Sequence, residues 1–207
     1  MRTVLLIAAY PFVTHYSVLH QNPWPAMVLL FLIAASVFGE KQKGKKLTRN
    51  GLASVAGFAV SGILLFKLMQ HYEFAILFFP PVFASLGFLF IFGRTLTPNR
   101  TPLITHIALL YHGGTLDPAL QRYTYHLTVA WVLLFAFLTV ESLCLAFFAS
   151  LDTWSLYTNG INYLFVLGLM AGDHIVRIWR FKHIKFPGFM GFLRMLKQTD
   201  FSSLYKS

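Results

Sequence analysis

Two acidic side chains lie inside apolar stretches of this 207-residue sequence. An ionisable group is costly there and marks a candidate functional site. Glu141 has no basic residue within its own apolar stretch. Its carboxyl must therefore be protonated, hydrogen-bonded to another helix or exposed to a polar cavity. A structural hydrogen bond and a role in transport, proton transfer or catalysis both remain open for Glu141.

The second acidic residue, Asp173, has a basic residue four positions further along the chain, Arg177. In a helix, residues at this spacing share one face and can form an ion pair. The pair can be structural, as a local ion pair or as an anchor between its helix and a neighbouring connection. Alternatively, it can contact a lipid headgroup or a substrate at the inner leaflet.

Signals for a metal, a cofactor or a catalytic nucleophile are missing. The eight histidines form neither a His-x-x-x-His pair nor a His-Glu-x-x-His motif, and there is one cysteine. No Gly-x-Ser-x-Gly, phosphate-binding loop or Gly-x-Gly-x-x-Gly occurs either. We expect no metal and no cofactor, and we favour a non-enzymatic protein over an enzyme.

The composition is that of a membrane protein. Charged residues make up 12% of the chain and hydrophobic residues 57%, whereas soluble domains carry about 25% charged residues. A membrane-spanning helix needs about 20 mostly apolar residues. Six stretches qualify, which predicts an all-α, polytopic protein with six spans, at residues 3–19, 23–39, 52–69, 74–92, 127–151 and 154–178.

The basic residues indicate the orientation of these spans. With the N-terminus in the cytoplasm, all of the 17 Lys and Arg residues except Lys67 fall on the cytoplasmic side. The positive-inside rule therefore places both termini in the cytoplasm. This distribution also accounts for the net charge of +10 without nucleic acid. We expect one transmembrane domain, residues 1–180, followed by a basic cytoplasmic tail, residues 181–207.

The cytoplasmic connection between the fourth and fifth spans has helical features of its own. Apolar residues at positions 103, 104, 107 and 110 follow helical spacing, which predicts a short helix in the membrane interface. Gly113-Gly114 ends it. Asp117 and Pro118 then predict an N-cap and a first-turn proline that open the fifth helix before the bilayer.

Several residues predict how the helices meet each other and the lipid. Gly168 and Gly172 form a small-xxx-small pattern, which favours packing within the chain first and dimerisation second. The apolar surroundings of Cys144 predict a buried thiol. Tryptophans favour headgroup depth, so we expect one pair at the outer ends of their helices and one pair near the inner ends: Trp24 and Trp154, then Trp131 and Trp179.

Beyond these patterns, the second half of the chain resembles an uncharacterised family of bacterial inner-membrane proteins. The resemblance covers roughly residues 80–180. It is carried by Phe92-Gly93-Arg94-Thr95-Leu96, Arg100-Thr101-Pro102-Leu103-Ile104-Thr105, Tyr123-Thr124, Thr128, Trp131, Trp154-Ser155, Asn162-Tyr163, Asp173 and Arg177. The chain departs from the family at Asp173, where we expect Glu, and at His106, where a basic residue is usual.

Members of that family are typically encoded beside acyl carrier proteins and other enzymes of aryl polyene-like or fatty-acid-like lipid synthesis. The resemblance implies a component of such a system in the bacterial inner membrane. Its partners would be membrane lipids and an acyl carrier protein or another lipid-synthesis enzyme. Because carrier proteins are acidic, Arg94, Arg100 and Arg122 are candidate docking residues, although they could instead contact anionic headgroups.

A different class of function also fits the sequence. A membrane-embedded acyl or headgroup transferase, or a small transporter, would use Glu141 together with Asp173 and Arg177 in a polar cavity.

Overall fold

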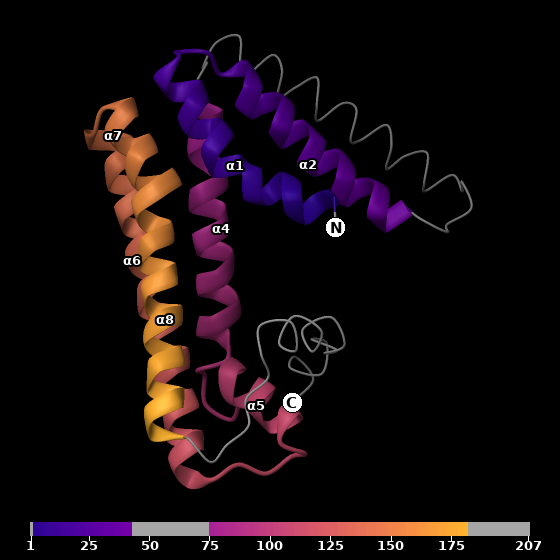
Figure 1. Cartoon of the computed structure of the whole chain (residues 1–207), viewed down its shortest axis with the longest axis vertical. Coiled ribbons are helices and arrows are strands. Elements are labelled where there is room, and N and C mark those ends of the chain that lie inside the picture. The colour runs from indigo at the N-terminus through magenta and orange to yellow at the C-terminus, as the bar shows by residue number, and fades with distance from the viewer. Residues whose placement is uncertain (1, 43–74, 182–207) are drawn as a thin grey trace. The chain divides into compact units, whose positions relative to one another are not determined.

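The computed structural model describes residues 2–42 and 75–181, and every regular element in these ranges is helical (Figure 1). The elements are α1 (Arg2–Leu19), α2 (Trp24–Gln42), α4 (Ala75–Arg94), α5 (Leu103–Tyr111), α6 (Pro118–Phe148), α7 (Leu151–Leu156), the π-helical turn η1 (Tyr157–Ile161) and α8 (Asn162–Arg180).

Three helical stretches are long and apolar enough to cross a membrane, by length and composition. They are Leu77–Arg94, Pro118–Phe148 and Leu151–Arg180. Two shorter apolar helices, Thr3–Leu19 and Trp24–Gly39, precede them. The chain is therefore a helical protein suited to membrane insertion. The predicted third span, residues 52–69, and the tail beyond residue 181 lie outside the described residues.

Large apolar side chains cover the outside of these helices. Phe147 and Phe148 are 79% and 88% exposed, and Leu133 is 65% exposed. In water such a surface would be an aggregation site. In a bilayer the lipid tails cover it, because they are as apolar as a protein core.

The described contacts form two compact units. Unit 1 consists of Met1–Val82 with Ser142–Tyr163, and unit 2 consists of Phe83–Glu141 with Leu164–Ser207. Helices α4, α6 and α8 each contribute residues to both units. The predicted boundary between a single domain and a tail stays a prediction.

The core of unit 1 is built around one tryptophan. Trp154 is fully buried and clusters with Val18, Ala26 and Leu77, and its ring meets the edge of Phe78 with centroids 4.4 Å apart. Trp154 therefore packs inside the protein, and its expected depth at the headgroups stays a prediction. Residue type alone does not separate an interfacial tryptophan from one that packs inside a helix bundle.

The break between the first two predicted apolar stretches is confirmed, because α1 ends at Leu19 and α2 begins at Trp24. The first N–H groups of α2 all find partners. Asn22 Oδ1 accepts from the N–H of Trp24 at 3.1 Å. Ser17 Oγ on α1 accepts from Ala26 at 3.1 Å, and Pro25 has no N–H to satisfy. Side chains that cap a helix start in this way keep its backbone donors paired where lipid offers no acceptor.

Helix α1 also holds the π-helical turn of unit 1. His15 Nδ1 lies 3.0 Å from Ser155 Oγ, and Asn159 Nδ2 donates to the same oxygen at 3.2 Å. Thr158 donates back to the carbonyl of Trp154 at 2.8 Å. A π turn widens the helix and shifts the register of the side chains that follow it. These polar contacts fix where that shift occurs.

Unit 2 has an aromatic core between α4 and α6. Phe88 stacks on Phe135 with centroids 5.0 Å apart, and Trp131 stacks on Phe135 at 5.5 Å. Phe92 lies 5.5 Å from Phe135. Offset and tilted aromatic pairs of this kind add to the packing of apolar surfaces. Trp131 therefore packs against protein, while Trp179 is 78% exposed and free to lie at headgroup depth.

One prediction about a covered face is wrong, and another has no support among the described residues. At Gly168 and Gly172, a side-chain carbon would have no atom of a neighbouring described element within 4 Å. Close packing at these glycines therefore stays a prediction. Cys144 is exposed rather than buried. In a membrane helix an apolar run does not reveal which face meets protein, because lipid can take the place of a core.

Candidate functional site

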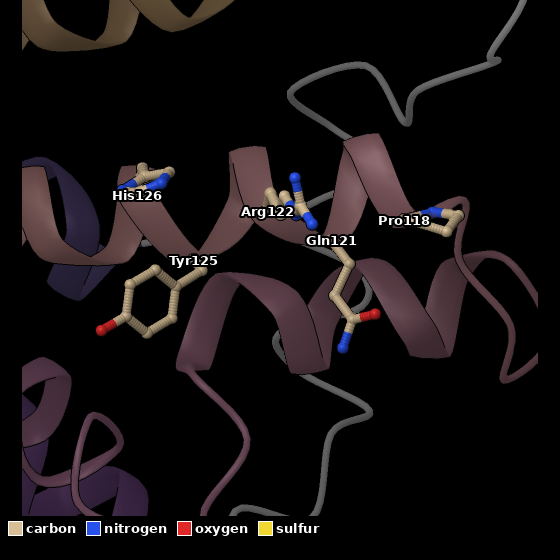
Figure 2. Close-up of a pocket in the computed structure, with 5 residues that line it drawn as sticks. All are labelled: Pro118, Gln121, Arg122, Tyr125 and His126. Atoms are coloured by element: carbon tan, nitrogen blue, oxygen red, sulfur yellow. The ribbon is translucent and has the colours of Figure 1, made fainter.

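The first turns of α6 form the centre of the candidate site. Asp117 Oδ1 accepts from the N–H of Ala119 at 2.7 Å, and Pro118 is the first helical residue, so the predicted helix start is confirmed. Figure 2 shows these turns with the side chains on their outer face. One side of this segment contacts α8, a second contacts α5 and a third faces outward.

The preceding helix ends as its glycines predict. Gly113 and Gly114 have φ values of +73° and +95°, a region that favours glycine because it has no Cβ. The N–H of Gly114 donates to the carbonyl of Leu109 at 2.8 Å. This is the hydrogen bond that closes many helix C-termini. It ends α5 and turns the chain toward α6.

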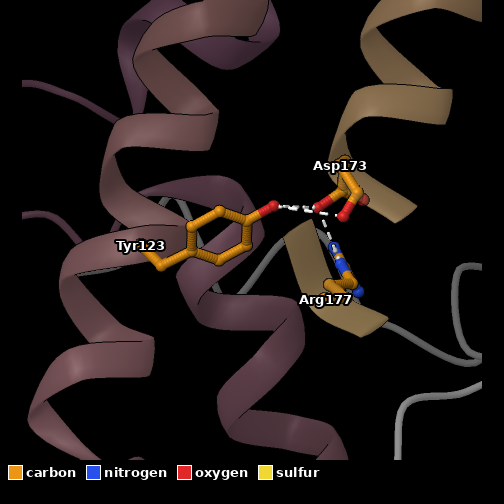
Figure 3. Close-up of polar contacts among 3 residues, drawn as sticks. All are labelled: Tyr123, Asp173 and Arg177. Atoms are coloured by element: carbon orange, nitrogen blue, oxygen red, sulfur yellow. Dashed lines mark hydrogen bonds and ion pairs between the residues drawn. The ribbon is translucent and has the colours of Figure 1, made fainter. Parts of the chain in front are cut away.

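The first side of α6 binds α8 (Figure 3). Tyr123 donates its hydroxyl proton to Asp173 Oδ1 at 2.6 Å, and Arg177 Nε donates to the same oxygen at 2.7 Å. The predicted ion pair between Asp173 and Arg177 is thus confirmed, and its carboxylate also ties α8 to α6. Hydrogen bonds to a charged group each contribute about 1.5–3 kcal/mol. This role of Tyr123 could not be predicted from the sequence, because no local spacing relates it to Asp173.

The end of α8 packs on the same tyrosine. Phe181 is buried, and its ring centroid lies 5.2 Å from that of Tyr123. The N–H of Phe181 donates to the carbonyl of Arg177 at 3.1 Å. Tyr123 is therefore held at its hydroxyl by a carboxylate and at its ring by an aromatic neighbour.

The second side of α6 binds α5 through threonines. Thr124 Oγ1 lies 2.9 Å from Thr105 Oγ1. Thr128 Oγ1 accepts from the backbone N–H of Ile104 at 3.3 Å. In the turn directly after α4, Thr95 Oγ1 accepts from the N–H of Leu103 at 3.0 Å. Helix α5 has Pro102 at its N-cap position and no side-chain cap of its own, so neighbouring elements supply the acceptors that a helix start needs.

The donor directions in this threonine cluster follow from each residue's own helix. Thr124 and Thr128 donate their protons to the carbonyls of Gln121 and Thr124, at 3.0 and 2.9 Å. Thr95 donates to the carbonyl of Phe92 at 2.7 Å. Each oxygen is then left as an acceptor. Thr105 must therefore be the donor to Thr124. Threonine suits this task because one hydroxyl both donates and accepts.

The third side of α6 faces outward. Its side chains line a shallow hollow and recur three or four residues apart, so they follow one face of the helix; we call them the α6 stripe: Pro118, Gln121, Arg122, Tyr125 and His126. Gln121, Arg122, Tyr125 and His126 are exposed. Figure 2 shows them along the same helix. The stripe contains a cation and amide, phenol and imidazole groups, but no acidic residue.

The three candidate docking arginines come from three elements. Arg94 is the last residue of α4, with its guanidinium 5.9 Å from the ring centroid of Phe90. Arg100 lies half-buried in the turn before α5, and Arg122 is exposed on the α6 stripe. Of the three, Arg122 is the most accessible.

Glu141 lies half-buried on α6 and takes part in a polar interaction. Within residues 2–42 and 75–181, no three His, Cys, Asp or Glu side chains gather in a way that could hold a metal ion. A catalytic or transport role for Glu141 stays a prediction.

Partial burial lowers the pKa of His106 on α5 below its ordinary value of 6.5. Loss of water disfavours the charged imidazolium. The neutral ring is therefore favoured at this position.

Comparisons with family models, with curated proteins and with solved structures gave no match to this chain.

Proposed function

We propose that this protein is a non-enzymatic, multi-pass component of a lipid or aryl polyene synthesis system in the bacterial inner membrane. In this proposal it docks an acidic acyl carrier protein at the connection between α4 and α6. The observation that supports it most is the start of α6, which is held by neighbours on two sides and carries exposed donors on the third.

The proposed orientation rests on charge. With the third span at residues 52–69, six spans put both termini and all Lys and Arg residues except Lys67 in the cytoplasm. The connection from α4 to α6 then faces the compartment in which a carrier protein would be found. Its arginines are attractive to an acidic partner at long range, which raises the rate of encounter.

The fixed start of α6 matters for affinity. A binding surface that is already ordered loses little conformational freedom when the partner arrives. Tyr123 is fixed by Asp173, and Thr124 and Thr128 are fixed by α5. Arg122, which lies between these residues in the sequence, therefore projects from a segment that does not need to order on binding.

The test is charge reversal followed by co-purification. In the first variant, Arg94, Arg100 and Arg122 are all replaced by Glu. In the matched control, three lysines of the tail are replaced by Glu with the same change of charge: Lys182, Lys185 and Lys197. Both are extracted from membranes, and recovery of the tagged carrier protein is measured against the amount of inserted protein.

The proposal predicts that the arginine variant loses the carrier protein and that the lysine variant retains it. Unchanged recovery with the arginine variant would overturn the proposal. Equal loss in both variants would also contradict it, because any basic surface would then serve.

A further inference from the structure

The α6 stripe has the form of a helix-binding face, and we propose that it receives one carboxylate-bearing helix of the acidic partner. This inference rests on the proposed function and specifies which surface and which element of the partner make the contact.

The geometry of the stripe points to an elongated occupant. Its members occupy positions i, i+3, i+4, i+7 and i+8 of one helix, and at 1.5 Å rise per residue they extend for about 12 Å. Rows of side chains at these spacings are the ridges and grooves through which two helices pack. A compact ion would use only one point of such a face.

The chemistry of the stripe selects acidic side chains. Arg122 can bind a carboxylate through two parallel N–H donors, and the amide of Gln121 and the ring of His126 add further donors. Arg122 and His126 are four residues apart, so they match carboxylates placed one turn apart on the opposing helix.

Two other features favour such a contact. Tyr125 is 45% exposed and lies between the polar groups. Its ring centroid is 5.4 Å from that of His126, nearly perpendicular to it, and it offers rigid apolar area at the centre of the contact. Asp117, which directly precedes the stripe in the sequence, accepts from the N–H of Ala119 through Oδ1, so this oxygen is bound at the helix start.

Site-specific photo-crosslinking tests this inference. The full-length protein carries p-benzoylphenylalanine in place of Tyr125, in membranes that also contain the carrier protein. The matched control carries the same probe in place of Tyr111 on α5, which is 38% exposed and lies off the stripe. We expect the probe at position 125 to crosslink to a helix of the carrier protein and the probe at 111 not to do so.

A charge exchange supplies the second measurement. Arg122→Glu should weaken carrier binding at least tenfold, and Lys in place of the carboxylate identified by the crosslink should restore it. Failure of every such exchange, or crosslinks from position 125 to phospholipid alone, would overturn the inference.

The two proposals fail in different ways. If reversal of the three arginines abolishes co-purification while position 125 gives no crosslink, docking stands and the stripe is not the contact. If reversal leaves co-purification unchanged, the proposed function itself is wrong.

Discussion

Unit 1 and the start of α6 in unit 2 both use side chains of one element to cap the helix start of another, but they differ in what they leave uncovered. In unit 1, Ser17 caps α2, and Ser17, Ser155 and Thr158 are all buried. In unit 2, Thr95 and Thr128 cap α5, while Arg122 and its neighbours on the stripe stay exposed. Unit 1 thus buries its capping side chains, whereas the start of α6 keeps an exposed polar face, on which the proposed docking depends.

The largest expected effect is at the core of unit 1. Trp154→Ala removes a fully buried ring that contacts Val18, Ala26 and Phe78, and such truncations cost about 3–5 kcal/mol. Thermal unfolding in detergent should show a large drop in Tm, while the folded fraction keeps its carrier affinity. Trp179→Ala, at a ring that is 78% exposed, is the control. A loss of carrier affinity in folded Trp154→Ala protein would contradict the expectation that the core of unit 1 affects stability and not carrier binding.

A smaller loss is expected at the contact between α6 and α8. Tyr123→Phe and Asp173→Asn each remove part of one charged hydrogen-bonded pair, worth about 1.5–3 kcal/mol. Because the two side chains contact each other, the double variant should lose less than the sum of the single losses. Additive losses in a double-mutant cycle of unfolding free energies would show that the contact contributes nothing.

The contact between α5 and α6 should respond locally. Thr128→Val keeps the shape but removes the acceptor for the N–H of Ile104, and an unsatisfied buried donor costs about 1–3 kcal/mol. Hydrogen exchange at Ile104 should become faster, whereas Thr97→Val, at an exposed hydroxyl, should leave it unchanged. Equal protection of Ile104 in all three proteins would show that the threonine does not hold α5.

A weak pH dependence is expected at His106. Its pKa is lowered in the folded protein, so below pH 6.5 the unfolded chain takes up a proton more readily than the folded one. The folded state therefore loses a little stability as the pH falls through 6.5 toward the folded pKa. At pH values well above 6.5, His106 causes no loss of stability. An NMR titration of the ring should give a midpoint below 6.5, with His106→Gln used to assign the signal. A midpoint at or above 6.5 would contradict the partial burial of the ring.

The smallest expected effect is at Glu141. If the protein is non-enzymatic, Glu141→Gln should insert normally and leave lipid or polyene product unchanged. Lost product with normal insertion would instead favour the transferase or transporter alternative.

The local features of the fold could be predicted from the sequence. Apolar length indicated α1, α2 and α4, and helical spacing with two glycines and an Asp-Pro pair located α5 and the start of α6. The candidate site could be predicted only in part. The pairing of Asp173 with Arg177 follows from spacing within one helix, whereas Tyr123 comes from another helix and depends on packing.

The features that sequence patterns missed depend on which helix face is covered. Trp154 is in a core, and Cys144 is exposed. In a membrane protein, lipid-facing and protein-facing positions are both largely apolar. The threonine contacts were missed for a related reason. Thr95, Thr124 and Thr128 each donate to a backbone carbonyl three or four residues earlier, so the sequence gives no sign of their further contacts.

The proposed function requires that Arg94, Arg100 and Arg122 bind an acidic protein rather than anionic lipid. Binding in nanodiscs of purely zwitterionic lipid tests this most directly. In such discs the account predicts saturable binding of the purified carrier protein, weakened at least tenfold by Arg122→Glu and by raised salt. The absence of saturable binding, or binding that Arg122→Glu leaves intact, would contradict it.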